Sequence, residues 1–335
     1  MTTAHTPLVT VVIPARNEGE AIQDALGNVA AQTYPLDCVE VVVVDGNSTD
    51  QTAAFAQSAL DASPFRRTGV VHNPKASTPS NLNLGLDWAA GEILVRVDSR
   101  SMIPPNYIET LVAVLADPAV AVAGGSQVAV ARSTSIKDRA IARALNNRYA
   151  MGGSSYRKPG ATSGPVDTVY LGSFRTAQLR EAGGWNESFA TNQDFELNRR
   201  MASYGHVWFE AGLPVGYFAR QTLREIWQQY HRFGRWKARY WSETGDRPQP
   251  RQIALVAVPT VALPLVGIMG LRSPRLMALA AAVAPLTIDA VGGERPDGRP
   301  EVRLLAGVVN AIVGLAWWSG VLSGTVAETR PSEGT

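Results

Sequence analysis

LVRVDSRSMIPPNYIETL, residues 94–111, is the stretch from which the fold of this chain can be worked out. A run of β-forming residues stops at Asp98, a polar turn and two prolines follow, and a new apolar pattern then begins. In open α/β sheets, ligands bind outside the carboxyl ends of the strands, so a carboxylate at such an end is well placed for chemistry. Taken alone, Asp98 could equally well be an ordinary residue that turns the chain after a strand.

The first half of the chain alternates between strand and helix patterns. Strands are predicted within residues 8–16, 39–50, 68–74 and 92–98, where β-branched residues run almost without interruption. Helices are predicted at 22–30, at 50–62 with Ser48 or Thr49 as its cap, and at 78–91. Buried strands separated by helices indicate parallel βαβ units, so the predicted fold class is α/β. A further strand is predicted at 119–131, where the pair Gly124 and Gly125 indicates that another backbone approaches closely.

The composition excludes several classes of protein. Hydrophobic residues make up 45% of the 335, charged residues make up 18%, and the net charge is +2. The chain is therefore not disordered, and it is not expected to bind nucleic acid with its whole surface. Its single cysteine, Cys38, excludes an intramolecular disulfide, its four histidines lack zinc-type spacing, and no signal peptide is expected. The glycine-rich motifs of dehydrogenases and P-loop NTPases are absent from the sequence.

Acidic residues follow three of the predicted strands. They are Glu18, Asp45 and Asp98. Carboxylates in one pocket can accept hydrogen bonds from a base and a ribose, and they can hold a divalent cation against a diphosphate. The basic residues near the same strand ends could offset phosphate charge, and they are Arg16, Lys75 and Arg100. Any one of these residues is more often a turn or cap residue, but their repetition at successive strand ends favours a binding site.

Six motifs follow one another in an informative order. Three open the chain: Pro14-Ala15-Arg16-Asn17-Glu18, Val44-Asp45-Gly46-x-Ser48-Thr49-Asp50 and Val95-Arg96-Val97-Asp98. Three come later: Lys75-x-x-Thr78-Pro79-Ser80-x-Leu82-Asn83, Asp167-Thr168-Val169-Tyr170-Leu171-Gly172-x-Phe174-Arg175 and Asn192-Gln193-Asp194-x-Glu196-Leu197-Asn198-x-Arg200. Up to about residue 245 the chain resembles the family 2 glycosyltransferases, in particular the bacterial exopolysaccharide branch with the succinoglycan glucosyltransferases. The resemblance implies a GT-A fold, which is a nucleotide-binding α/β domain with a mixed, mainly parallel sheet.

The resemblance also implies roles on the donor side. Pro14, Glu18 and Asp45 would border the nucleoside, and Asp45 would reach the base. Asp98 would face the ribose or the diphosphate as the first residue of the family's Asp-x-Asp motif, with a divalent cation, Mg²⁺ or Mn²⁺, beside it. Arg100 stands at the second acidic position, where the family has a metal-contacting aspartate. An arginine is a fixed cation that could itself neutralise a diphosphate, so the need for a metal is left open.

By the same resemblance, Asp194 is the expected catalytic base. Sugar transfer with inversion needs one carboxylate that takes the proton of the acceptor hydroxyl. Glu196 is the second choice for the base, and Glu196, Trp185 and Arg232 are expected on the acceptor side. The alternative is that Asp194 is only the N-cap of a helix. Residues 133–165, which include the glycine- and serine-rich run 151–155, are a candidate for a mobile loop over the site, or for a plain surface connection.

The C-terminal part indicates a membrane. Residues 220–251 hold eight Arg or Lys against three acids, with aromatic residues at helical spacing, as in helices that lie on anionic membranes. The alternative is a helix packed on the catalytic domain. Apolar stretches at 253–271, 276–291 and 304–326 predict two or three transmembrane helices, or a re-entrant hairpin from the first two. The predicted domains are 1–219 for catalysis, 220–251 at the interface, 252–327 in the membrane and 328–335 as a tail.

These patterns predict an inverting, membrane-anchored glycosyltransferase. It would move a hexose from a nucleotide-sugar, UDP-linked in our reading, to a lipid-linked or exopolysaccharide acceptor. The protein would be multi-pass in the inner (plasma) membrane with a cytoplasmic catalytic domain, and nucleic acid is not an expected partner. Two alternatives are a non-catalytic membrane protein that binds nucleotide-sugar and a processive polysaccharide synthase.

Overall fold

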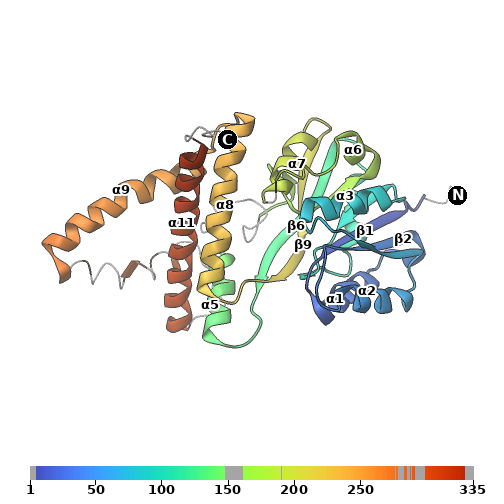
Figure 1. The fold of residues 1–335 in the computed structure, drawn as a ribbon, viewed down its shortest axis with the longest axis horizontal. Coiled ribbons are helices and arrows are strands. Elements are labelled where there is room, and N and C mark those ends of the chain that lie inside the picture. The colour runs from blue at the N-terminus through green and yellow to red at the C-terminus, as the bar shows by residue number, and fades with distance from the viewer. Residues whose placement is uncertain are drawn as a thin grey trace, which may run out of the picture. The chain divides into compact units, whose positions relative to one another are not determined.

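The computed structural model describes residues 5–147, 161–189, 191–275, 277, 283, 284, 287, 289, 290 and 299–328. The chain divides into two compact units (Figure 1). The first comprises Met1–Gln127 and Gly160–Tyr217, and the second comprises Val128–Pro159 and Phe218–Thr335. Of the predicted loop 133–165, residues 148–160 lie outside the described residues, and Ile136–Leu145 form a helix. Most of the predicted stretch 276–291 also lies outside the described residues.

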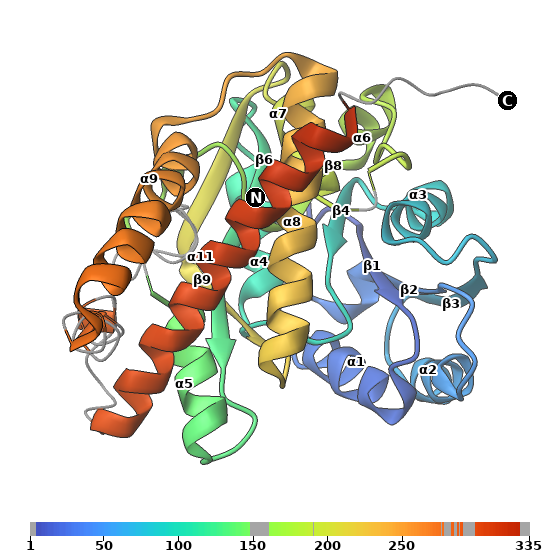
Figure 2. The ribbon, with the colours of Figure 1, turned by 60° about the vertical axis from the view of Figure 1, so that its left-hand side comes forward.

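The first unit begins with a parallel half-sheet. Its strands are β1 (Val9–Ala15), β2 (Val39–Asp45), β3 (Arg67–His72) and β4 (Ile93–Arg96), side by side in the order β3-β2-β1-β4. Every residue of β1 and β2 is buried, which explains their unbroken apolar sequences. Figures 1 and 2 show α1 (Ile22–Ala30) and α2 (Thr52–Asp61) on one face of these strands and α3 (Thr78–Trp88) on the other. The short 3₁₀ helices η1 (Gly19–Ala21) and η2 (Leu36–Cys38) lead into α1 and β2.

The second half of this sheet is antiparallel. The order continues β4-β8-β6-β9-β5, through β8 (Tyr170–Arg175), β6 (Val120–Val130), β9 (His206–Phe218) and β5 (Ser101–Met102), while β7 (Gly164–Pro165) pairs with β9. The connecting helices are α4 (Tyr107–Leu115), α6 (Thr176–Glu181) and α7 (Gln193–Met201). The predicted close approach at the glycine pair is confirmed, because a Cβ at Gly125 would lie 2.2 Å from the carbonyl oxygen of Leu213. The predicted mixed sheet is confirmed, with parallel strands in its first half and antiparallel strands in its second half.

One prediction about a helix start is wrong. Helix α2 begins at Thr52, its N-cap is Gln51, and the cap makes no side-chain hydrogen bond. Ser48 and Thr49 instead contact the loop after β1, where the Ser48 hydroxyl accepts a hydrogen bond from the Asn17 backbone N–H at 2.9 Å. The motif is used to join two loops rather than to start a helix.

The second unit is helical. Among its described residues are α5 (Ile136–Leu145), α8 (Leu223–Thr244), α9 (Pro250–Arg272) and α11 (Pro300–Glu328). Helix α8 starts with a capping box between Thr222 and Glu225. Helix α11 packs closely along α8, since a Cβ at Gly320 would lie 2.1 Å from the carbonyl oxygen of His231 (Figure 2). Helix α11 also contacts α5.

Among the described residues of this unit, two helices are long and apolar enough to cross a membrane, by length and composition alone. They are Gln252–Arg272 in α9, whose apolar window is not buried, and Pro300–Gly324 in α11, whose window is 44% buried. The predicted domain boundaries remain predictions, although α5 belongs to the second, helical unit rather than to the sheet. Part of the apolar face of α8 is covered by α11, while Leu223 and Trp227 at its start are exposed.

Candidate active site

The acidic strand ends lie at one edge of the sheet. Strands β1, β2 and β4 are parallel and adjacent, and the register pairs Ala15 with Asp45 and Val12 with Arg96. Glu18, Asp45 and Asp98, which follow or end these strands, therefore come to the same carboxyl edge. Pro14 is a buried residue within β1, next to Val44 of β2. The sequence thus predicted correctly which edge collects the acidic side chains.

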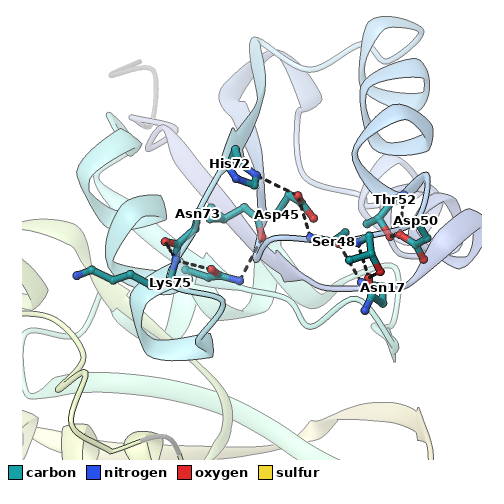
Figure 3. Close-up of polar contacts among 11 residues, drawn as sticks. Asn17, Asp45, Ser48, Asp50, Thr52, His72, Asn73 and Lys75 are labelled. Carbon is teal, nitrogen blue, oxygen red and sulfur yellow. Dashed lines mark hydrogen bonds and ion pairs between the residues drawn. The ribbon is translucent and has the colours of Figure 1, made fainter.

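Asp45 is the most buried of these carboxylates, with 5% of its side chain exposed. Its Oδ2 accepts a hydrogen bond from the Ser48 backbone N–H at 3.3 Å and lies 3.4 Å from His72 Nδ1 (Figure 3). Its Oδ1 is buried and has no hydrogen-bond partner among the described residues. A buried acceptor without a donor is unfavourable by about 1–3 kcal/mol. The Oδ1 atom is therefore suited to accept a hydrogen bond from an N–H group of a ligand.

The loops around Asp45 are held by a chain of side-chain hydrogen bonds (Figure 3). Asn17, in a left-handed conformation with φ 52°, accepts a hydrogen bond from the Thr49 backbone N–H at 2.9 Å. The Thr52 hydroxyl accepts from the Glu18 backbone N–H at 2.9 Å and donates to Asp50 at 2.5 Å. The hydrogen bond from Thr52 is also the main cause that lowers the pKa of Asp50. These polar residues connect the loop after β1 with the loop after β2.

A second network lies between β3 and α3. The buried Asn73 amide donates to Ser80 and to Asn81, each at 2.7 Å, and its oxygen accepts from the Lys75 backbone N–H at 3.0 Å. The Lys75 ammonium lies 2.9 Å from a carboxylate oxygen of Glu187, and its hydrogen bond is the main cause that lowers the pKa of Glu187. Lys75 thus reaches toward the segment before α7 in this conformation, and its predicted role at the phosphates remains a prediction.

Arg100 forms an ion pair with Glu18. Its Nε donates to Glu18 Oε2 at 2.7 Å, and 43% of the Arg100 side chain is exposed against 10% of Glu18. Arg16 is exposed and makes a long contact of 3.4 Å to the carbonyl oxygen of Ala76. The position at which the family has a metal-contacting aspartate is thus occupied by Arg100, and Glu18 holds this arginine in place.

One arginine brings Asp98 and Asp194 together. Arg96 donates from Nε to Asp98 Oδ1 at 2.7 Å and from Nη1 to Asp194 Oδ1 at 2.5 Å. Asp98 follows β4, whereas Asp194 lies in the first turn of α7. The N-cap of α7 is Asn192. The alternative that Asp194 serves only as a helix N-cap is therefore wrong.

Burial makes Asp194 more basic than an ordinary aspartate. Desolvation is the main cause that raises its pKa above 3.8, even though 37% of its side chain is exposed; Arg96 opposes the rise and Asp98 adds to it. The indole N–H of Trp185 also lowers this pKa, although its geometry falls short of a hydrogen bond. Burial alone would lower the pKa of Arg96, but Asp194 and Asp98 outweigh burial and raise it. Arg96 is thus a permanent cation between two carboxylates.

The residues predicted on the acceptor side differ in their positions. Glu196 is tied to Arg200 by hydrogen bonds of 2.6 and 2.9 Å, one turn further along α7. Trp185 is 1% exposed and packs edge-on against Phe174, so its ring supports the site from within the core. Arg232 is an exposed residue of α8 in the other unit. Of the two candidate bases, Glu196 is paired with an arginine of its own helix, whereas Asp194 is paired with Arg96 of β4.

The residues around Asp98 do not by themselves form a metal site. In the part of the chain that the structure describes, no group of three or more His, Cys, Asp or Glu could hold a metal ion. One Asp98 oxygen is bound by Arg96, and Arg100 occupies the second acidic position. A divalent cation at Asp98 remains a prediction.

No role was predicted for Arg96, although the sequence holds a signal for it. It is a charged residue inside a strand whose other residues are apolar and buried. A guanidinium in such a place requires carboxylate partners, because an unpaired buried charge is very unfavourable. The sequence could therefore have indicated a buried ion pair, but it could not have identified Asp194 as a partner.

The family models agree with this architecture. Residues 93–319 match the model "Glycosyl transferase family group 2", and residues 10–175 match the model "Glycosyl transferase family 2". The chain belongs to the family 2 glycosyltransferases, and it is an enzyme that transfers a sugar from a sugar donor.

Individual relatives extend the likeness over most of the chain. The chain is 29% identical over 320 residues to the succinoglycan biosynthesis protein ExoA of Rhizobium meliloti (strain 1021), covering 92% of each chain. It is 26% identical over 235 residues to a dolichyl N-acetyl-alpha-D-glucosaminyl phosphate 3-beta-D-2,3-diacetamido-2,3-dideoxy-beta-D-glucuronosyltransferase of Methanococcus voltae, covering 68% of this chain and 71% of the relative. The mannosyltransferase PcManGT from Pyrobaculum calidifontis, solved with GDP-Man and Mn²⁺, has a TM-score of 0.59 at 21% identity, with 95% and 88% coverage. At this identity the solved structure shows the shared GT-A fold.

Proposed function

We propose that this protein is an inverting glycosyltransferase that moves a hexose from a UDP-linked donor to a lipid-linked saccharide in exopolysaccharide synthesis. The observation that carries the proposal is the joining of Asp98 and Asp194 by one buried arginine. Asp98 at the donor edge and Asp194 in α7 thereby lie beside the same part of the proposed active site. The likeness to ExoA over 92% of both chains supports the exopolysaccharide pathway.

In this proposal the donor lies along the carboxyl edge of the parallel strands. Asp45 Oδ1, which lacks a hydrogen-bond partner, accepts a hydrogen bond from an N–H of the base. Asp98 faces the ribose and diphosphate. The positive charge that the leaving diphosphate needs comes from Arg100, with Arg16 and Lys75 near the same edge. The nucleoside-diphosphate leaves without a general acid, because its own charge is balanced by these side chains.

The transfer itself is a single displacement. The acceptor oxygen attacks the anomeric carbon as its proton passes to Asp194, and the bond from that carbon to the diphosphate oxygen breaks with its electron pair. One displacement inverts the anomeric configuration. An aspartate whose pKa is raised by burial suits this role, because it is a stronger base than an ordinary aspartate.

The site is placed at a membrane in this proposal. The apolar helices α9 and α11 and the exposed basic residues of α8 support an enzyme anchored at the cytoplasmic face of the inner membrane. A lipid-linked acceptor would then reach the site from the bilayer. Family membership favours this enzyme over a non-catalytic binding protein.

The experiment compares purified wild-type protein with Asp194→Asn. Turnover of UDP-sugar in the presence of lipid-linked acceptor should fall by about 10²- to 10⁴-fold, because the amide cannot take the proton. The donor should still stabilise the variant in a thermal-shift assay, since the donor edge is intact. Glu196→Gln is the matched control, and it should keep far more activity. Equal turnover by Asp194→Asn and wild type would refute the assignment of the base.

A further inference from the structure

Arg96 is the residue that joins the two halves of the site. It lies in β4, a strand of four buried residues, and 6% of its side chain is exposed. Burying a guanidinium is favourable only if carboxylates pair with it and satisfy its hydrogen bonds. Asp98 and Asp194 provide this pairing, and they come from elements far apart in the sequence.

The geometry differs from that of an ordinary ion pair. In a two-pronged arginine–carboxylate pair, two N–H groups bind the two oxygens of one carboxylate. Arg96 instead gives Nε to Asp98 and Nη1 to Asp194. Because the guanidinium is planar and rigid, it determines the position of one Oδ1 atom relative to the other. One of these oxygens belongs to the donor edge and the other to the base.

The charges around Asp194 explain what Arg96 does for it electrostatically. Burial and the nearby Asp98 both raise the pKa of Asp194, and Arg96 is the cation that opposes them. Among the described residues, the Trp185 indole also lowers the pKa of Asp194, while the buried Tyr170 and Tyr107 interact with Arg96 and Asp98. Without Arg96, the carboxyl group of Asp194 would remain partly buried beside a like charge and would lose the cation that opposes the rise of its pKa.

We propose that Arg96 is a positioning residue that aims the Asp194 carboxylate at the acceptor and balances its negative charge, by holding it to the donor-side Asp98. This inference rests on the proposed function, because it assigns Asp194 the role of base. Arg96 takes no proton and forms no bond to substrate in this reaction. Its effect reaches the chemistry through Asp194.

The test is a pH profile of kcat for Arg96→Gln and Arg96→Lys. In the pH profile of Arg96→Gln, the acidic limb is the pH range in which kcat falls as the base becomes protonated. Removing an opposite charge at this distance should move this limb upward by about one to three pH units. Activity lost at neutral pH should therefore return as the pH rises, with a smaller change in the KM of the donor. Lysine keeps the charge but cannot bind both carboxylates in a fixed plane, so Arg96→Lys should move the limb less.

Arg67→Gln is the matched control. Arg67 also pairs with a buried acid, Glu40, at 3.3 Å, but at the opposite end of the strands from the site. The acidic limb of the kcat profile of Arg67→Gln should coincide with that of the wild-type profile. A merely structural role for Arg96 would lower kcat at every pH by the same factor, and a uniform loss of this kind would overturn the proposal.

A second measurement does not depend on turnover. In a double-mutant cycle with Arg96→Gln and Asp194→Asn, urea unfolding in detergent should show that the two effects are not additive. Additive effects would overturn the inference whether or not the protein turns over a donor. If the effects are non-additive but the protein turns over no sugar donor, the contact between Arg96 and Asp194 is supported and the proposed function is refuted. Non-additive effects with an unmoved acidic limb would overturn the positioning role.

Discussion

Among single residues, Asp45 combines deep burial with an unused hydrogen-bond acceptor. The other acidic strand ends are paired, Glu18 with Arg100 and Asp98 with Arg96. Asp45 Oδ2 has contacts to Ser48 and His72, but Oδ1 has none among the described residues. An acceptor in this state gains more from a ligand N–H than an exposed carboxylate would, because water does not compete for it.

Asp45→Asn should therefore weaken donor binding specifically. The amide has the same size but is a poorer acceptor, so the KM for the nucleotide-sugar should rise roughly 10-fold, with a smaller change in kcat. Steady-state kinetics with varied donor concentration measures both. Asp37→Asn, at an exposed residue of η2, is the control and should behave as wild type. A fall in kcat at constant KM would contradict the proposed contact with the base.

Among elements, the packing of β6 against β9 depends on glycine. A Cβ at Gly125 would overlap the Leu213 carbonyl oxygen, and one at Gly124 would lie 2.6 Å from the Tyr170 carbonyl oxygen. These glycines let the antiparallel strands approach each other beside β8, which joins this half of the sheet to β4. Strand β4 ends next to Asp98. It is therefore supported, through β8, by a close contact between strands that residues larger than glycine would prevent.

Gly125→Ala should destabilise the fold by about 1–3 kcal/mol, because the added methyl group forces the two strands apart. Urea unfolding followed by tryptophan fluorescence measures the free energy of unfolding. Gly164→Ala is the control, because a Cβ at Gly164 in β7 has no neighbour within 4 Å. Similar losses for the two variants would show that the close approach does not limit stability.

The helix pair α8–α11 uses glycine in the same way. Gly320 faces the His231 carbonyl oxygen, and Gly234 faces the Trp317 carbonyl oxygen at 2.1 Å from its added Cβ. Small residues at a helix crossing let the two backbones come close. The apolar face of α8 is therefore used at least partly for packing against α11.

Gly320→Ala should lower the melting temperature of the protein in detergent. Alanine favours a helix over glycine by roughly 0.5–1 kcal/mol, so a fall would have to come from the clash at the crossing. Gly314→Ala, in the same helix with no neighbour within 4 Å of its Cβ, should leave the melting temperature unchanged or raise it. If Gly320→Ala were as stable as Gly314→Ala, the close contact of α8 and α11 would be contradicted.

In the molecule as a whole, a large apolar surface is left on α9. Ile253, Val258, Val261 and Leu265 are each more than half exposed, and Leu271 is 89% exposed. Pro259 and Pro264 lie inside this helix. Prolines are tolerated within membrane helices more often than within soluble ones. A helix with this surface and sequence suits a lipid environment.

The protein should float with lipid vesicles and be released by detergent rather than by high salt. Leu265→Arg should weaken this association, because an arginine at the centre of a membrane helix is unfavourable by about 2.5–3.5 kcal/mol. Gln228→Arg, at an exposed polar residue of α8, is the control and should float like wild type. Release of the wild-type protein by salt alone would show that charge rather than α9 holds it to the membrane.

The sequence by itself determined the α/β class, the parallel strands and the edge at which Glu18, Asp45 and Asp98 gather. It could do so because unbroken apolar runs form buried strands, and the carboxyl ends of parallel strands share one edge. It also identified the glycine pair of β6 and the long apolar helices. These features are local, or they follow from the regular geometry of a sheet.

Only the tertiary structure decided which side chains meet. Residue types and spacing do not reveal that Arg96 binds both Asp98 and Asp194, that Arg100 pairs with Glu18, or that α11 covers α8. The expected cap at Ser48 or Thr49 was wrong for the same reason, since their partner Asn17 lies in another loop. Contacts between distant segments depend on how the chain packs, and local sequence carries little information about that. The stretch 94–111 indicated Asp98 as a residue of the site, and the fold shows that Arg96 links Asp98 to Asp194.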